Sequence, residues 1–207
     1  MAVDSSGNVY VAGWENDRIR KITPAGEVTT IAGSTLGHND ATGTEAQFRS
    51  PTDVAVDSSG NLYVTDSNNH LIRKITSGGD VTTLAGDGTA AQFDYPSGVA
   101  VDSSGNLYVT DSNNHRIRKI TSAGVVTTLA GSGTRGHKDA TGTEAQFNYP
   151  YGVAVDSSSG ILYVADWFNH RIRKITPGGV VSTSPAVVQR ASRILPAQMR
   201  GLAVPPA

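Results

Sequence analysis

The 207-residue chain contains no cysteine, so disulfides cannot stabilise it and thiols give no information about its redox compartment. No stretch approaches the roughly 20 apolar residues of a membrane-spanning helix. The 17 basic and 18 acidic residues leave a formal net charge of −1, which gives no electrostatic argument for a nucleic-acid or membrane-surface partner. The first ten residues, MAVDSSGNVY, lack a basic segment followed by an apolar run, so they do not form a signal peptide.

What the sequence does contain is a long internal repeat. A segment written DSSGN, or a close variant of it, begins at Asp4, Asp57, Asp102 and Asp156, and each copy is followed by a stretch similar to NHRIRKIT. Repetition at a period of about 50 residues is typical of solenoids and propellers. The fold class is therefore expected to follow from one unit and its copies.

Each unit is expected to form four short strands. In the third copy, segments rich in Val, Ile, Tyr and Thr occupy 98–102, 106–111, 116–121 and 125–131. Asp102 can accept backbone N–H groups of the first turn, and Gly105 can adopt the left-handed conformation that closes it. The pattern predicts an all-β fold, a β-propeller of four-stranded antiparallel blades. The four predicted blades cover approximately 1–33, 50–86, 95–131 and 149–184.

The segment YPYGVAVD…ILYVADWFNHRIRKIT at 149–176 resembles an NHL repeat, and the resemblance covers four units within residues 1–184. It implies a β-propeller, most often six-bladed, in a family of protein-binding and RNA-binding modules, extracellular sensor domains and a few lyases. The nearly identical copies are most similar to bacterial secreted or cell-surface NHL proteins. An extracellular or cell-surface location is expected if the full-length protein carries a signal.

The ends of the chain predict an incomplete ring. Residue 1 falls inside a first strand, and the repeat register fails after about residue 184. Within the divergent tail, 185–207, the segment Gly201–Val204 is either the first strand of a fifth blade or a chance match, and a tail with no fold of its own is a further alternative. We expect four blades of a larger propeller, which further blades or another chain would close. A closed four-bladed ring is the alternative.

Two long connectors between blades carry matching polar residues. In a propeller they share one face with the loops between the second and third strands, and function usually lies on such longer loops. A His-x-Asp pair near a Glu could bind a metal, but Asp in such segments more often accepts local backbone N–H groups. We predict no metal and no cofactor. The weak metal candidates are His38 and Asp40 in one connector and His137 and Asp139 in the other.

The repeated histidines and cations favour a structural role. His70, His115 and His170 occupy equivalent positions, and separate blades hold such positions apart, so a hydrogen-bonded histidine is favoured over a metal ring. Strand alternation sends Arg116 and Arg118 to one side and Lys119 to the other. Their stems can cover apolar surface, and residues such as Asp111 can pair with them. RNA binding is therefore disfavoured.

Departures from the repeat give the ligand-binding candidates. Where the second and third blades have Ser-Asn, the fourth has Trp167-Phe168 and the first has Trp14-Glu15. Exposed aromatic residues are typical partner anchors, although these could instead pack against a connector. Tyr151 replaces a Ser or Thr, and Asp53 replaces a Gly, beside the expected channel mouth.

These patterns predict a non-catalytic interaction scaffold that binds a protein or other ligand through the face of loops and connectors. No unique nucleophile and base stand apart from the repeat, and a residue copied into every blade serves the blade. The alternative is a propeller enzyme of lyase or lactonase type, centred near Asp53, Tyr151 and the connector histidines. RNA binding is a third, weaker hypothesis.

Overall fold

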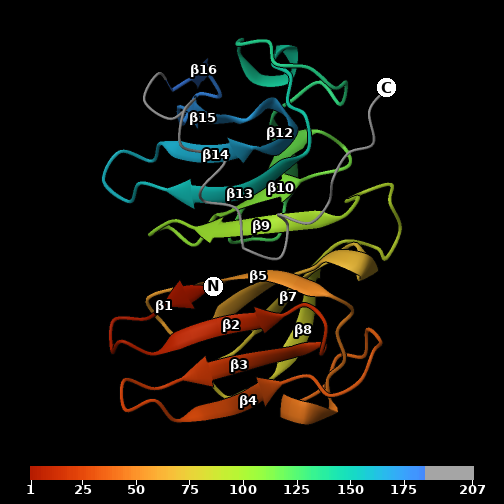
Figure 1. Ribbon diagram of the computed structural model, residues 1–207, viewed down its shortest axis with the longest axis vertical. Helices are drawn as coiled ribbons and strands as arrows, with labels where there is room; N and C mark the ends of the chain where they lie inside the picture. Colours follow the sequence, from red (N-terminus) through yellow and green to blue (C-terminus); the bar gives the residue numbers. More distant parts are fainter. Residues whose placement is uncertain (185–207) are drawn as a thin grey trace.

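The computed structural model describes residues 1–184, and these form four sheets of four antiparallel strands each (Figure 1). The predicted β-propeller fold class is confirmed. Each sheet pairs its strands in chain order, as expected when tight hairpins join β-branched segments. The possible fifth-blade strand, Gly201–Val204, and the rest of 185–207 lie outside the described residues.

The strand bounds follow the repeat. The first sheet contains β1 (Ala2–Val3), β2 (Val9–Gly13), β3 (Arg18–Ile22) and β4 (Val28–Ala32), and the second contains β5 (Pro51–Val56), β6 (Leu62–Asp66), β7 (Leu71–Ile75) and β8 (Val81–Ala85). The third contains β9 (Pro96–Val101), β10 (Leu107–Asp111), β11 (Arg116–Ile120) and β12 (Val126–Ala130), and the fourth contains β13 (Pro150–Val155), β14 (Leu162–Asp166), β15 (Arg171–Ile175) and β16 (Val181–Thr183). Short 3-10 turns lie at η1 (Gly43–Glu45), η2 (Ser67–Asn69), η3 (Gly142–Glu144) and η4 (Trp167–Asn169).

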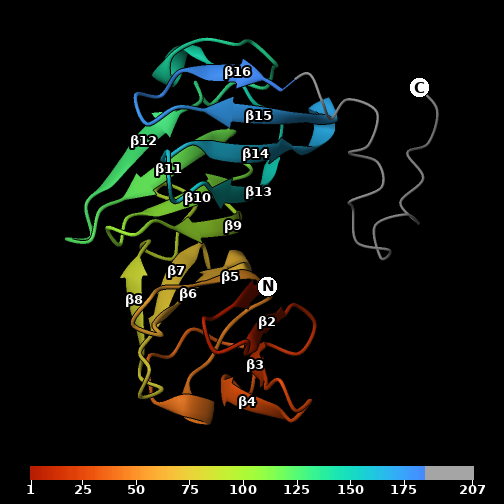
Figure 2. The same cartoon turned by 90° about the vertical axis from the view of Figure 1, so that its left-hand side faces the viewer.

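The sheets follow one another around an open arc. Figure 2 shows the inner strands β5, β9 and β13 toward the centre of the arc and the outer strands β4, β8, β12 and β16 on its outside. Contacts run from β5 to β9 and from β9 to β13, while β13–β16 make no comparable contact with β1–β4. The closed four-bladed ring is therefore wrong for residues 1–184, because too few sheets are present for the first to meet the fourth.

The first turn of each blade is closed by its aspartate. Asp102 Oδ1 accepts the backbone N–H groups of Ser104 and Asn106 at 2.9 Å, and the Tyr108 hydroxyl donates to Asp102 Oδ2 at 3.1 Å. Gly105 has φ +77°, which an L side chain adopts only with strain. The sequence predicted both features. They fix the hairpin and tie it to the second strand.

Apolar side chains fill the space between neighbouring sheets. Leu107, Tyr108 and Val109 are 1%, 7% and 0% exposed, so the middle strand buries both faces as its continuous apolar run predicted. Three buried clusters lie between successive sheets, one at each junction. Because these clusters join the sheets, the sheets form a scaffold that holds the loops at their ends. No helix within residues 1–184 has the length and hydropathy to cross a membrane.

Candidate functional site

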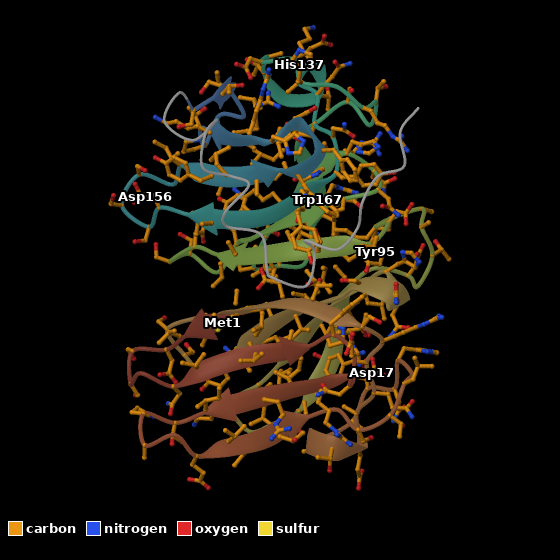
Figure 3. The ribbon with its side chains drawn as sticks, viewed as in Figure 1. Met1, Asp17, Tyr95, His137, Asp156 and Trp167 are labelled. Carbon is orange, nitrogen blue, oxygen red and sulfur yellow. The ribbon has the colours of Figure 1, made fainter. Side chains whose placement is uncertain are left out.

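The two ends of the sheets differ in the segments they carry. Asp156, in a first turn, lies at one end, while Asp17, Tyr95 and Trp167 lie toward the other (Figure 3). That second end carries the loops between second and third strands and the connectors between sheets, and we call it the loop face. All of the residues discussed below as a candidate binding site belong to it.

The repeated histidines hold adjacent blades together at the loop face. His70 Nδ1 accepts the backbone N–H of Tyr95 at 3.2 Å, and His115 Nδ1 accepts that of Tyr149 at 3.2 Å. Asp17 does the same in the first blade, where its carboxylate accepts the Ser50 N–H at 2.8 Å. The hydrogen-bonded structural histidine that the sequence favoured is thus observed at these two positions.

Two of the repeated arginines are fully internal. Arg73 Nη1 lies 2.9 Å from Asp66 Oδ2, Arg173 Nη1 lies 2.8 Å from Asp166 Oδ2, and all four side chains are 0% exposed. A charge buried this completely requires a partner, and here each has one. These guanidinium groups are therefore not available to the phosphates of a nucleic acid.

Hydroxyl side chains join the second blade to the third near the centre of the arc. Thr52 Oγ1 lies 2.9 Å from Thr65 Oγ1 and 2.6 Å from Ser67 Oγ. Thr52 also donates to the Ser97 carbonyl at 2.9 Å, and Ser67 to the Pro96 carbonyl at 2.6 Å. These bonds satisfy buried polar groups at the inner end of strand β9. The third blade repeats the arrangement toward the fourth with Ser97, Thr110 and Ser112.

The fourth blade replaces this hydroxyl cluster with apolar groups. Tyr151, Ala165 and Trp167 stand where the third blade has Ser97, Thr110 and Ser112. The rings of Tyr151 and Trp167 pack edge to face with centroids 5.6 Å apart. Trp167 and the adjacent Phe168 belong to η4, which projects them from the end of β14. The substitution of three small polar residues turns a blade junction into an aromatic surface.

A hollow of about 510 Å³ opens beside these rings on the loop face. Phe168 contacts the Trp167 ring at a centroid distance of 4.7 Å and the Tyr149 ring at 5.0 Å, and it is 48% exposed. The loop ends of the third and fourth sheets, together with the connector between these sheets, therefore line one hollow. Its lining residues are Tyr95, Ser112, Asn113, Arg135, Asn148, Tyr149, Tyr151, Trp167 and Phe168.

Arg135 supplies the positive charge of this aromatic hollow. Its Nη2 donates to the Tyr149 hydroxyl at 2.8 Å, and its guanidinium carbon lies 5.0 Å from the centroid of the Tyr149 ring. Burial, and then the positive charge of Arg135, lower the pKa of His115. Burial raises the pKa of Tyr151, with Tyr95 and Asp53 adding to the effect. The hollow thus presents a neutral phenol, a fixed cation and a cluster of rings packed edge to face or tilted.

The structure brings together three of the five ligand-binding candidates. Tyr151, Trp167 and Phe168 line the aromatic hollow, whereas Trp14 is 52% exposed and makes no aromatic contact within residues 1–184. Asp53 lies in β5 and accepts the Val99 N–H at 3.2 Å and the Met1 amino group at 2.7 Å. Asp53 does not line the hollow, and its oxygens already have donors.

The weak metal candidates have other partners. Asp40 Oδ2 accepts the Thr83 N–H at 3.0 Å, and Asp139 Oδ2 accepts the Thr183 N–H at 2.9 Å. His38 lines a separate hollow of about 500 Å³ on the second blade, while His137 lies at the far end of the molecule (Figure 3). Within residues 1–184 no three His, Cys, Asp or Glu side chains are placed to hold a metal ion.

Six of the nine lining residues were not among the candidates from the sequence, and three of these six are aromatic or charged. Tyr95 and Tyr149 stand where the first connector has Ser50, and Arg135 stands where it has Leu36. Both departures are visible in an alignment of the connectors. Their meaning needed the structure, because φ values of +55° and +50° at the two tyrosines turn the chain into β9 and β13 and aim the rings along the loop face.

The family model described as NHL repeat matches residues 48–75, 93–120 and 147–175. NHL repeat-containing protein 2 of Gallus gallus is 39% identical over 89 residues, which are 42% of this chain and 12% of that protein. The matched segments contain strands of the second, third and fourth sheets together with the NNH or FNH loop. They are the same segments that the internal repeat singles out.

Solved structures show the same fold. A streptogramin B lyase matches with a TM-score of 0.67 at 17% identity, over 89% of this chain and 53% of that one. A Bacteroides thetaiotaomicron protein of unknown function matches at 0.66 and 27%, over 87% and 46%. An auxiliary nutrient binding protein from Bacteroides ovatus matches at 0.64 and 19%, over 87% and 45%. The chain therefore spans about half the length of these proteins. The chain therefore carries three NHL repeats and has the β-propeller fold of these solved structures.

Proposed function

We propose that this chain is a non-catalytic binding module whose loop face holds a protein or other ligand at the aromatic hollow. The observation that carries the proposal is the replacement of the hydroxyl cluster in the fourth blade by Tyr151, Ala165 and Trp167. In the neighbouring blades this position joins sheets. In the fourth blade it holds two half-buried rings, and the adjacent Phe168 is 48% exposed at the rim. Rigid aromatic groups of this kind contribute much of the binding energy at interfaces.

The lining indicates the chemistry of the ligand. Clustered aromatic rings favour a flat apolar group, while the Arg135 guanidinium favours an adjacent negative charge. The side-chain amides of Asn113 and Asn148 add donors and acceptors at the rim. A ligand that combines an aromatic or other flat apolar part with a carboxylate, sulfonate or similar anion would use all three features. The auxiliary nutrient binding protein from Bacteroides ovatus shares this fold, and a binding function is compatible with the proposal.

A repeat-matched variant tests the site. The double substitution Trp167→Ser with Phe168→Asn converts the DWFNH loop to the DSNNH of the other blades, so the local backbone has a precedent in the same chain. We expect anilinonaphthalene sulfonate, a flat aromatic anion, to bind the parent chain at one site and to bind this variant at least tenfold more weakly. Equal binding with an unchanged circular dichroism spectrum would show that the aromatic hollow is not a binding site.

Catalysis of a lyase or lactonase type is the second candidate. Its support is the shared fold with a streptogramin B lyase, at only 17% identity, and the Tyr151 phenol whose pKa burial raises. His38 and His137 belong to different connectors, which does not favour one centre built from both. Metal analysis of the purified chain distinguishes the candidates: one tightly bound metal ion per chain would contradict the non-catalytic proposal.

We further propose a bacterial source and an extracellular or cell-surface location. The support is the pair of Bacteroides neighbours with the same fold. We also propose that further blades or another chain close the ring, since the described sheets form an open arc. The full reading frame tests these proposals, because a signal and additional repeats would be visible in it. The internal Arg–Asp pairs do not favour a nucleic-acid partner.

A further inference from the structure

The outer edges of the second and fourth sheets are covered by the connectors that precede those sheets. Beside β8, the Val81 N–H donates to the Ala41 carbonyl at 2.9 Å, and the Gly43 N–H donates to the Gly79 carbonyl at 2.9 Å. The connector therefore continues the sheet as a short extra strand. Beside β16, the same two bonds join Val181 to Ala140 at 2.8 Å and Gly142 to Gly179 at 2.9 Å.

An aspartate anchors each covering segment to the buried arginine beneath it. Asp40 Oδ2 accepts the Thr83 N–H at 3.0 Å, and Asp40 Oδ1 lies 2.5 Å from Arg73 Nη2. Arg73 Nη2 also donates to the Asn39 carbonyl at 3.1 Å. The segment thus closes over a guanidinium that is 0% exposed. Asp139, Thr183, Arg173 and Lys138 repeat these contacts in the fourth sheet.

The third sheet lacks this cover because its connector is nine residues shorter. Residues 87–90 stand where the next connector has 132–144, so the segment equivalent to Asp139–Gly142 is missing. The remainder of the connector keeps its place. Arg118 Nη1 donates to the Gln92 carbonyl at 2.6 Å and to Asp111 Oδ2 at 3.0 Å, and its guanidinium lies 5.2 Å from the Phe93 ring.

Three groups are consequently left open at the edge of β12. Because β12 has the register of β8 and β16, the N–H groups of Val126 and Thr128 point out of the sheet, and no acceptor within residues 1–184 meets them. Arg118 is 13% exposed, and no acceptor among the described residues faces its Nη2. Val126 is half-buried, whereas Val81 and Val181 are each 2% exposed.

We propose that this open edge binds an extended acidic segment of a partner protein, which adds to the third sheet as a strand. The two covered edges supply the template: an aspartate that reaches the arginine and the strand N–H, then a small residue whose carbonyl accepts the Val126 N–H. Main-chain bonds of this kind give affinity, and one charged side chain sets the register. Residues 185–207 contain no Asp or Glu, so the chain's own tail does not have the required chemistry.

The probe for this site is a peptide of residues 36–46, LGHNDATGTEA, with both ends blocked. We expect this peptide to bind the full chain in a calorimetric titration and to shift the amide resonances of β12. Changing the peptide aspartate, Asp40 in the chain, to Asn should weaken binding at least tenfold, because it removes the charge that faces Arg118. This change leaves the protein untouched. Equal affinity of the two peptides would overturn the proposal.

A grafted connector provides the matched control. Replacing residues 87–90 with residues 132–144 gives the third sheet the cover that the fourth already has. This variant should bind the peptide at least tenfold more weakly than the parent chain. Undiminished binding would place the peptide elsewhere and overturn the proposal. If the parent chain self-associates and the graft does not, the occupant of the edge is a second copy of this chain, which would also overturn it.

Discussion

The two outer strands of the second sheet and those of the third have nearly the same sequences, but their surroundings differ. β7 and β8 read LIRKI and VTTLA, and β11 and β12 read RIRKI and VTTLA. Yet Arg73 is sealed under a connector that supplies Asp40, while Arg118 has only Asp111 and a carbonyl and remains partly exposed. Identical strand sequence therefore does not fix the environment of the strand. The length of the preceding connector does.

The comparison teaches how a repeat protein diversifies. Many of the shared contacts stay inside each blade, as the Arg–Asp pairs and the aspartate-closed turns show, and the repeated histidines join adjacent blades in the same way. The contacts that differ are made by connectors and by loop residues such as Trp167. Because each sheet packs mainly on its neighbours, a change at one rim or loop leaves the other blades intact. The aromatic hollow and the open edge of β12 are two such local changes.

The largest expected effect comes from removing the sealed arginine. Arg73→Leu leaves the buried carboxylate of Asp66 without its counter-charge. It also removes the ion pair with Asp40, which holds the covering connector in place. We expect it to lower the free energy of unfolding by about 3–5 kcal/mol, measured by urea denaturation. Arg118→Leu removes fewer partners and should cost less. Equal losses would show that the connector contributes nothing to the stability of the second sheet.

A smaller difference is expected from the valines at the two rims. Val81→Ala removes two methyl groups from a site that is 2% exposed, and it should cost about 2 kcal/mol. Val126→Ala acts at a half-buried position and should cost less than about 1 kcal/mol. Parallel urea denaturation of the two variants checks this. A larger loss for Val126→Ala would mean that β12 is covered in solution.

The covering aspartates should contribute less again. Asp139→Ala breaks the contacts with Arg173 and Thr183, but the Asp139 side chain is 46% exposed, so solvent screens part of the interaction. We expect a loss of about 1 kcal/mol in the free energy of unfolding, and faster amide exchange at Val181. Asp87→Ala, in the short connector, is the control and should change neither quantity. If exchange at Val181 stayed slow, the segment would be held without its aspartate.

The smallest expected effect is a pH dependence confined to the covered rims. Burial opposes ionisation of Asp40 and Asp139, but hydrogen bonds from the strand N–H and the arginine outweigh it and lower both pKa values below 3.8. A carboxyl with a lowered folded pKa stabilises the fold above its unfolded pKa and loses that contribution as the pH falls. Amide protection at Val81 and Val181 should therefore decrease only below about pH 4.

The same experiment tests the open edge. Val126 should exchange rapidly at every pH, after correction for the intrinsic rate, because no carboxylate covers it within residues 1–184. If the Val126 amide were instead protected, and that protection were lost in the same acidic range, an acidic segment from outside residues 1–184 would be covering β12. Protection that does not change with pH would contradict both the open edge and the role of carboxylates at the covered ones.

Much of each blade was predictable from local sequence. Val, Ile and Thr segments between Asp-Ser-Ser-Gly turns predicted the strands, and Gly105 predicted the left-handed turn that is observed. The pairing of Arg118 with Asp111 was also foreseen, since both lie on adjacent strands of one hairpin. These features depend on residues close in the chain, whose geometry the backbone fixes directly.

The candidate site was only partly predictable. Trp167, Phe168 and Tyr151 were found as breaks in the repeat, but Tyr95, Tyr149 and Arg135 were not. Nor did the sequence show that Asp40 and Asp139 would hold buried arginines instead of standing free in a loop. In each case the partner lies in another blade or on the far side of a connector, at a separation that periodicity does not report.

The sequence by itself determined the strands, the turns, the repeat and so the propeller fold, because these follow from side-chain size, backbone preference and hydrogen bonding within a few residues. Only the tertiary structure decided which rings meet at the aromatic hollow and which sheet edges are covered. Those outcomes depend on where a connector of given length reaches after the sheets have packed. Nine missing residues thus turn one of three nearly identical strands into an open edge.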